Sequence, residues 1–357
     1  MRRARANGHV ANRAPSRRHH GAHRWTVLSV VAGEETMRAL VACLVLLALG
    51  GHGADRASGV PHQRGSRENL LFSVSSVSSV MRRSPLPQSA PVPGTAPKRI
   101  VSLIPAVTEM LFAIGAGPQV VAVSSFDRYP PEVTKLRRVG ALLDPDVERI
   151  LSLRPDLVAV YASQSDLRTQ LERAKIPVYV YSHAGLADVF VTLKQIGERV
   201  GHARAAADLA RSIQSRLDAI RRRVASRARP RTLVVFDREA LTLRGIYASG
   251  GVGFIHDMVG AAGGDNVFAD VKQQSVQATT ELILARRPDA ILELRGDPIT
   301  AEMKSKEIDV WRALASLPAV RNSRVFFLDD QKTVVPGPRV AEGVDLIAHT
   351  LHPDAFK

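Results

Sequence analysis

The chain has 357 residues, 45% of them hydrophobic, which is enough to bury a large core in two or three domains. Its net charge of +15 would suit a nucleic-acid binder only if the charge were clustered in the folded part. Residues 1–97 contain 13 Arg and 4 acidic residues, so residues 98–357 carry the remaining +6, scattered without aromatic residues between them. We therefore expect no nucleic-acid partner. The single cysteine, Cys43, excludes a disulfide framework.

Three segments precede the expected fold. Residues 1–36 are rich in Arg, His and Ala, and we interpret them as a non-native or disordered extension, with Met37 as an alternative start. Residues 37–53 (MRALVACLVLLALGGHG) have the charged start, short apolar run and small residues of a secretory signal, which predicts a periplasmic or cell-envelope location. Residues 54–97 are rich in Ser, Pro, Gly and Arg, which predicts a disordered linker.

The four residues that end at Cys43 (LVAC) resemble a lipobox. The apolar run continues after Cys43 and little precedes it, and this context argues against a lipid anchor. The run is also too short to span a bilayer.

Residues 98–201 alternate short apolar runs with helical patterns, as parallel α/β sheets do. Loops at the carboxyl ends of parallel strands face the ligand crevice in such sheets. Pro105, Phe126, Tyr129 and Tyr161 follow expected strands and are therefore candidate ligand contacts. The alternative is that Phe126 and Tyr129 only cover the core of this lobe.

The segment from Ala203 to about Arg227 predicts one helix of about 25 residues, or roughly 37 Å. No Ser/Pro/Gly-rich connection joins the α/β segments on its two sides, so we expect the helix itself (202–229) to bridge them. An ordinary packing helix within one domain is the alternative. Its apolar stripe consists of Ala206, Leu209, Ile213, Leu217, Ile220 and Val224.

The α/β pattern restarts after Pro230 and defines a second lobe, 230–357. The glycine-rich stretch Gly245–Gly253 matches neither a P-loop nor a dinucleotide fingerprint, and we interpret it as a flexible loop on the ligand side. The candidate ligand contacts in this lobe are Arg238, Tyr247, Asp330 and Arg339.

An internal repeat relates the two lobes by a shift of 133 residues. Glu, Ile, Leu, Arg, Pro and Asp recur in the same order and spacing, which indicates two copies of one α/β unit. The matched positions are Glu148, Ile150, Leu151, Arg154, Pro155 and Asp156 in the first lobe, and Glu281, Ile283, Leu284, Arg287, Pro288 and Asp289 in the second.

Five stretches resemble the class III (Fe/B12-type) periplasmic substrate-binding proteins of ABC importers over about residues 98–352: RIVSLIPAVTEMLFAIGAG, VSSFDRYPP, DVERILSLRPDLVAVY, AAGGDNVF and ELILARRPDAI. The resemblance implies an α/β fold of two Rossmann-like lobes with central parallel sheets, joined by one long helix, with the ligand cleft between them. It implies a small-molecule chelate ligand and an ABC permease dimer as partners. Glu148 and Glu281 stand where this family presents one docking glutamate per lobe, and a symmetric partner needs the same charge twice. We expect a monomer without a metal site or cofactor of its own, because any cobalt or iron belongs to the ligand.

Within this family the chain is most similar to cobalamin binders, through SSFDRYPP and VERILSLRPDLV. It departs from them where the cobalamin pocket carries Trp residues, because Leu142, Tyr161 and Ser275 stand at those positions. We expect a corrinoid ligand, with a ferric siderophore or haem as the alternative. Haem would need a Tyr or His ligand, for which Tyr161 is the candidate. A siderophore would need a cluster of arginines in the cleft, for which the candidates are Arg128, Arg238, Arg244, Arg295 and Arg339.

Other classes of function have less support. The sequence has no GxSxG, HExxH or Gly-rich Lys-Ser/Thr motif, so we do not expect an enzyme. An envelope-anchored interaction module without small-molecule cargo is the third class, and it predicts a filled cleft.

Overall fold

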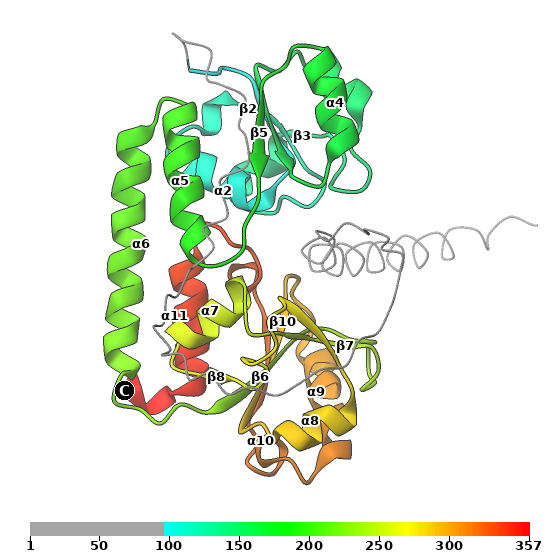
Figure 1. Cartoon of the computed structure of the whole chain (residues 1–357), viewed down its shortest axis with the longest axis vertical. Coiled ribbons are helices and arrows are strands. Elements are labelled where there is room, and N and C mark those ends of the chain that lie inside the picture. The colour runs from blue at the N-terminus through cyan, green and yellow to red at the C-terminus, as the bar shows by residue number, and fades with distance from the viewer. Residues whose placement is uncertain (1–95) are drawn as a thin grey trace, which may run out of the picture.

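The computed structural model describes residues 96–357, which form two lobes along one long helix, α6 (Figure 1). The predicted extension 1–36, the predicted signal 37–53 with Cys43, and the linker 54–97 up to residue 95 lie outside the described residues. Between residues 96 and 357, no helix is long and apolar enough to cross a membrane.

The first lobe is built on a parallel sheet of five strands in the order β3-β2-β1-β4-β5. Apolar strands form its centre because both of its faces are covered by helices. The lobe consists of β1 (Ile100–Ser102), α2 (Pro105–Ala113), β2 (Val120–Val123), β3 (Arg137–Arg138), α3 (Val147–Ser152), β4 (Leu157–Tyr161), α4 (Ser165–Arg173), β5 (Val178–Tyr181) and α5 (Ala187–Arg199).

The second lobe repeats this topology and adds an antiparallel edge. Its parallel strands lie in the order β8-β6-β10-β11, which corresponds to the order β2-β1-β4-β5 in the first lobe. Strand β7 pairs antiparallel with β6, and β9 pairs antiparallel with β7. The elements are β6 (Arg231–Asp237), β7 (Ile246–Ser249), α7 (Phe254–Ala261), β8 (Asp265–Asn266), β9 (Ser275–Ala278), α8 (Thr280–Arg286), β10 (Ala290–Arg295), α9 (Ala301–Asp309), α10 (Pro318–Arg321), β11 (Val325–Asp329) and α11 (Val340–Leu351).

The glycine-rich stretch is therefore only partly a loop, which corrects the interpretation of Gly245–Gly253 as a flexible loop. Its first half forms β7, because Ile246 and Ala248 are buried in the core of the second lobe. The remaining glycines make the turn into α7, where Gly253 has a φ of +104° that other residues rarely adopt.

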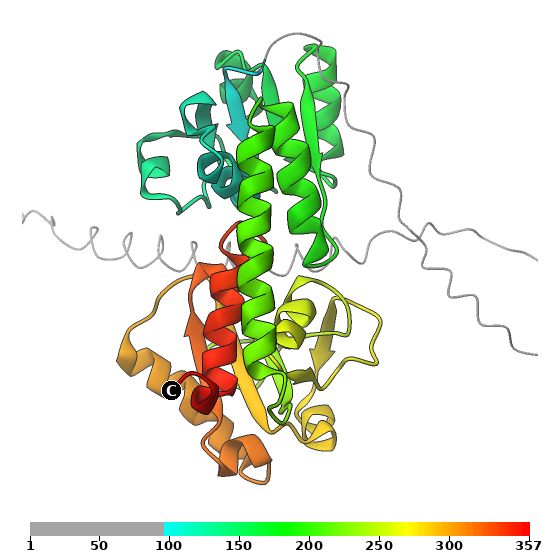
Figure 2. The same cartoon turned by 90° about the vertical axis from the view of Figure 1, so that its left-hand side faces the viewer.

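Helix α6 spans Ala203–Val224 and ends three residues earlier than predicted. It packs against α5 of the first lobe and against α11 and α7 of the second. Figure 2 shows it running along both lobes, with α11 beside its lower half. Five of the six predicted stripe residues are buried, and Leu209 packs against the same core. The prediction of a bridging helix is confirmed.

The 133-residue repeat has a structural counterpart in the turns that follow α3 and α8. Arg154 and Arg287 both adopt a left-handed backbone, with φ of 47° and 48°. Asp156 then accepts hydrogen bonds from the backbone N–H of Lys98 and Arg99, and Asp289 accepts one from the N–H of Arg231. These carboxylates thus hold the start of β1 beside the start of β4, and the start of β6 beside the start of β10.

Candidate ligand cavity between the lobes

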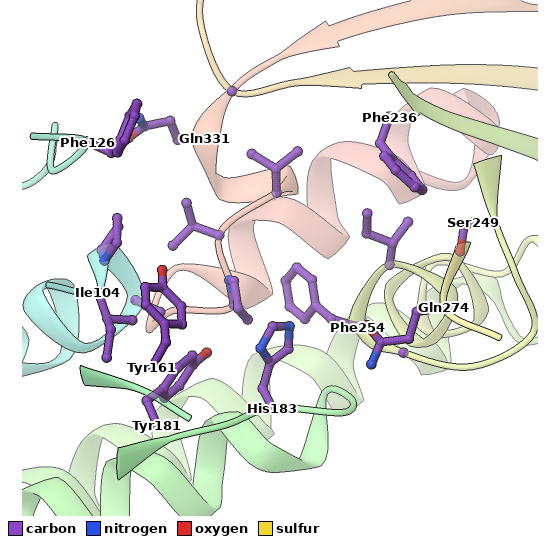
Figure 3. A pocket seen from close by; sticks show the side chains of 18 of the residues that line it. Ile104, Phe126, Tyr161, Tyr181, His183, Phe236, Ser249, Phe254, Gln274 and Gln331 are labelled. Atoms are coloured by element: carbon purple, nitrogen blue, oxygen red, sulfur yellow. The ribbon is translucent and has the colours of Figure 1, made fainter. Parts of the chain in front are cut away.

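A cavity of about 190 Å³ lies between the lobes, at the carboxyl ends of the strands of both sheets (Figure 3). Open α/β sheets hold their ligands at this edge, because the loops there can vary without disturbing the sheet. The cavity contradicts the expectation of a filled cleft that an interaction module without cargo would show. Its lining is mainly apolar and aromatic.

The first-lobe wall is a row of aromatic side chains that follow strand ends. Phe126 comes after β2, Tyr161 and Tyr181 end β4 and β5, and His183 comes two residues after β5. The Tyr161 and Tyr181 rings meet edge to face with centroids 5.9 Å apart, and the Tyr181 ring stacks on His183 at 5.6 Å. Figure 3 shows His183 next to Phe254 of the second lobe. The start of α2 completes this wall with Ile104, Pro105 and Ala106.

Burial shifts the pKa values of three of these side chains, and it raises the pKa of the Tyr181 phenol well above its ordinary value. Burial raises the pKa of Tyr161, and the charge of nearby Asp127 adds to the rise. Burial lowers the pKa of His183, with Asp188 opposing the change. The lining therefore presents two neutral phenols and a neutral imidazole at pH 7.

The second-lobe wall comes from the strand ends and from the turn before α7. Phe236 lies near the end of β6, Ser249 ends β7, and Phe254 begins α7. The other lining residues here are Val252, Gly253, Ile255, Gln274, Gly296, Asp297, Gln331, Val334, Val335 and Pro336.

Asp297 is the one carboxylate among the lining residues, and no Arg or Lys lines the cavity in the part of the chain that the structure describes. Its Oδ1 lies 3.6 Å from Nε of Arg128, which belongs to the first lobe. Both side chains are about half exposed, so the pair crosses the cleft in contact with solvent. An ion pair in that setting is worth at most about 1 kcal/mol and can open readily.

A second inter-lobe link is buried. Arg339, at the start of α11, forms a bidentate pair with Glu109 of α2, with N···O distances of 2.6 and 2.8 Å. Its guanidinium also lies 3.9 Å from the ring centroid of Tyr129. Burial raises the pKa of Glu109 and outweighs the opposing effect of Arg339.

A third link joins α7 of the second lobe to the start of α5. The Asp257 carboxylate accepts a hydrogen bond of 2.8 Å from the backbone N–H of Leu186. A Cβ added to the neighbouring Gly185 would lie 2.6 Å from the same carboxylate oxygen, so this approach requires glycine there. The lobes are thus held together by side-chain contacts in addition to α6.

Three of the ten predicted ligand contacts line the cavity: Pro105, Phe126 and Tyr161. Tyr129 and Arg339 lie outside it, because they pack on each other beside Glu109. Leu142 is buried in the hydrophobic core, and its carbonyl accepts a hydrogen bond from Gln164.

Four predicted contacts of the second lobe also lie outside the cavity. Arg238 is buried against the carboxylates of Glu293 and Glu307, at 2.7 and 2.8 Å, and no part of its side chain is exposed. Ser275 of β9 pairs with the lining residue Ser249, and Tyr247 lies two residues before Ser249 in β7, but neither lines the cavity. Asp330 caps the turn after β11 by accepting from the N–H of Lys332.

The five arginines considered for a siderophore do not form a cluster in the cavity, because each faces a carboxylate. Arg128 faces Asp297, Arg244 faces Glu239, Arg295 and Arg238 share Glu293, and Arg339 faces Glu109.

The structure adds cavity residues that the sequence analysis missed, chiefly Tyr181, His183, Phe236 and Phe254. Tyr181 ends β5 and His183 follows it, so the strand-end rule that selected Phe126 and Tyr161 would have found them. Phe254 was harder to find, because β7 and the glycine turn have no counterpart in the first lobe.

Glu148 and Glu281 are both exposed, each in the first turn of its helix, α3 or α8. Asp146 caps α3, and its carboxylate accepts a hydrogen bond from the N–H of Arg149. Thr279 caps α8 in the same manner. Hydrogen bonds from its own backbone N–H and from Thr279 lower the pKa of Glu281. Helix α8 lies on the side of the second lobe away from α6 (Figure 1).

Two α/β lobes, a single long connecting helix and a cavity between the lobes define a class III periplasmic substrate-binding protein. A model of the family described as "Periplasmic binding protein" matches residues 100–332. The "Uncharacterized ABC transporter substrate-binding lipoprotein YvrC" of Bacillus subtilis (strain 168) is 34% identical over 266 residues, which cover 73% of this chain and 82% of that protein. The chain therefore belongs to the periplasmic binding protein family.

Solved structures agree with this assignment. The periplasmic vitamin B12 binding protein BtuF of Vibrio cholerae matches with a TM-score of 0.63 and 25% identity, covering 74% of this chain and all of that one. The periplasmic heme-binding protein RhuT from Roseiflexus sp. RS-1, in apo form, matches with a TM-score of 0.63 and 27% identity, covering 73% and all of the respective chains. The shared fold supports an extracytoplasmic substrate-binding protein.

Proposed function

We propose that this chain captures a corrinoid of the cobalamin type in the inter-lobe cavity and delivers it to the permease of an ABC importer. The observation that carries the proposal is the cavity lining, in which aromatic rings from both lobes face one space and, among residues 96–357, no lysine or arginine takes part. A flat macrocycle with broad apolar faces suits such walls, because aromatic side chains bury large areas and stack on rings. The relative named for vitamin B12 binding agrees with this reading.

The same lining argues against a ferric siderophore. Many siderophore complexes are anionic, and their capture would use cationic side chains turned into the cavity. The five candidate arginines are each held by a carboxylate instead. Two of these pairs are solvent-exposed, Arg128 with Asp297 and Arg244 with Glu239, and only the first involves a residue that lines the cavity.

Haem is the second candidate, and one observation favours it. Tyr161, Tyr181 and His183 lie in a row on one wall, and a phenol or imidazole can supply an axial ligand to haem iron. One solved relative is named as heme-binding. A corrinoid can use the same row by stacking alone.

Delivery would use Glu148 and Glu281 as docking contacts on a two-fold-symmetric permease, with the binding protein acting as a monomer. The repeat presents the two carboxylates on equivalent helices. Complementary charge at such an interface speeds encounter and fixes register. The cobalt or iron would arrive with the ligand.

Calorimetric titration of the full chain with cyanocobalamin, haemin and ferric enterobactin, an anionic siderophore complex, tests the choice of ligand. The proposal predicts saturable 1:1 binding of cyanocobalamin, with the other two at least tenfold weaker. Tighter binding of haemin, with a Soret band that shifts in His183→Ala or Tyr161→Phe, would move the assignment to haem. Binding of ferric enterobactin alone would contradict both assignments.

A further inference from the structure

The positive charge of the described chain is concentrated on one element. Residues 203–231, which contain α6 and its exit, hold nine Arg and two Asp, a net of +7. Residues 98–357 as a whole carry +6, so the two lobes together carry a net of −1. Ligand capture in the cavity gives no reason for this asymmetry, because none of these arginines lines it.

All nine arginines of this arginine face are exposed: Arg204, Arg211, Arg216, Arg221, Arg222, Arg223, Arg227, Arg229 and Arg231. Four of them face a carboxylate, namely Asp208, Glu342, Asp218 and Asp265 for Arg211, Arg216, Arg221 and Arg229. The other five have no carboxylate within 4 Å among residues 96–357. Most of the charge is therefore available to a partner.

The carboxyl-terminal half of α6 also borders a hollow of about 490 Å³ against α11. Arg216, Arg222 and Arg223 line it, with Asp345 and Phe356 on the other side. The Arg223 guanidinium lies 5.1 Å from the ring centroid of Phe356. The hollow thus combines guanidinium groups with an apolar floor, which suits a phosphate headgroup and the first carbons attached to it.

The arginine face lies along the outer side of the molecule, where α6 runs unobstructed along both lobes (Figure 2). A helix of 22 residues is about 33 Å long, so several arginines can lie within one Debye length of a flat charged surface. Residues 203–231 contain no aromatic residue, so the face lacks the stacking platforms that single-stranded nucleic acids use.

We propose that the arginine face of α6, with the hollow at its carboxyl-terminal end, binds an anionic phospholipid surface. An exported protein that serves a membrane permease works beside such a surface. Because α8 lies on the far side of the second lobe from α6, a protein resting on the membrane through α6 holds Glu281 away from the bilayer. The resting and the permease-docked orientations are then mutually exclusive.

Vesicle co-sedimentation of the full chain tests this proposal without any cargo ligand. The probes are vesicles of pure phosphatidylcholine and vesicles with 30% phosphatidylglycerol, each at 0.1 and 0.5 M NaCl. Binding to neutral vesicles measures any contribution of the apolar leader. The additional binding to anionic vesicles then measures the effect of charge. Each arginine near such a surface contributes about fivefold to partitioning, so the wild type is expected to prefer anionic vesicles at least tenfold at 0.1 M NaCl.

Two variants with equal changes in net charge show whether the arginine face causes the extra binding to anionic vesicles. The triple variant R222Q/R223Q/R227Q removes three exposed arginines of the face that have no ion pair within residues 96–357. The control R137Q/R173Q/R321Q removes three exposed lobe arginines that also lack an ion pair within that part of the chain. We expect the first to lose at least tenfold in binding to anionic vesicles and the control less than threefold, with equal melting temperatures. Equal losses in both variants, no loss in the first, or no preference for anionic vesicles in the wild type would overturn the proposal.

Discussion

Asp127 is the most unusual single residue near the cavity. It follows Phe126, is almost fully buried, and one of its carboxylate oxygens, Oδ1, has no hydrogen-bond partner among the described residues. The other oxygen accepts from the backbone N–H of Ser124 at 2.8 Å. Burial raises its pKa to about 6, against the opposing hydrogen bond from Ser124 and the charge of Arg138. The ionised side chain is therefore a cost to the fold at neutral pH.

Asp127→Asn is expected to change how stability depends on pH. Because the folded pKa is raised, the stabilising contribution of the wild-type carboxyl is complete below pH 3.8 and is lost as the pH rises through about 6. As the pH rises from 3.8 to above 6, the free energy of unfolding of the variant should increase relative to that of the wild type by about 3 kcal/mol. Urea unfolding at several pH values measures it, with Asp166→Asn, an exposed position, as control. A difference between variant and wild type that does not vary with pH would contradict this account.

Phe126 and Tyr129 provide a matched pair from one loop, because only Phe126 lines the cavity. Phe126→Ala removes a stacking surface worth about 1.5–3 kcal/mol, so ligand affinity should fall at least tenfold. Tyr129→Ala loses its contact with Arg339 and should change affinity less than threefold. Titration of both variants with cyanocobalamin compares them, and equal losses would mean that the ligand lies closer to Tyr129.

Permease docking can be tested at the glutamates of α3 and α8. Reversing both charges, with Glu148→Arg and Glu281→Arg, should abolish ligand uptake in cells and leave affinity for the ligand unchanged, because neither residue reaches the cavity. The control reverses Glu172 and Glu302, which are exposed on α4 and α9 of the same two lobes. Transport that survives the first pair, or is lost with the control, would reject these two glutamates as the docking contacts.

At the level of elements, local sequence patterns predicted the features that depend on neighbouring residues, such as helices and the ends of strands. The apolar stripe from Ala206 to Val224 predicted α6, and the strand-end rule led to Phe126 and Tyr161. Long-range pairing could not be predicted in this way. Arg238 follows a strand as a ligand contact would, and only the folded chain brings Glu293 and Glu307 against it.

At the level of the whole molecule, the bidentate pair between Glu109 and Arg339 joins residues 230 positions apart and ties the lobes together behind the cavity. Sequence analysis selected Arg339 as a ligand contact because its partner could not be foreseen. Together with the Asp257 contact to Leu186, the pair limits how far the lobes can separate. The stiffness of α6 acts in the same direction, since one helix resists wide hinge bending.

Glu109→Gln should loosen this link. Removing one partner of a buried pair leaves the other charge uncompensated, so the free energy of unfolding should fall by about 2 kcal/mol or more. Ligand dissociation should also become faster, because the lobes separate more easily. Chemical unfolding and stopped-flow release measure the two effects. Glu342→Gln, which breaks the exposed pair with Arg216, should cost less than about 1 kcal/mol. A Glu109 variant no worse than this control would contradict the role given to the link.

The most direct test of the account is an experimental structure of the full chain with cyanocobalamin. We predict that the corrin ring lies in the inter-lobe cavity, with Phe126 and Tyr161 on one side and Phe254 on the other, and with the pair of Glu109 and Arg339 intact. A corrinoid bound outside the cavity, or no corrinoid bound at saturating concentration, would contradict the central claim.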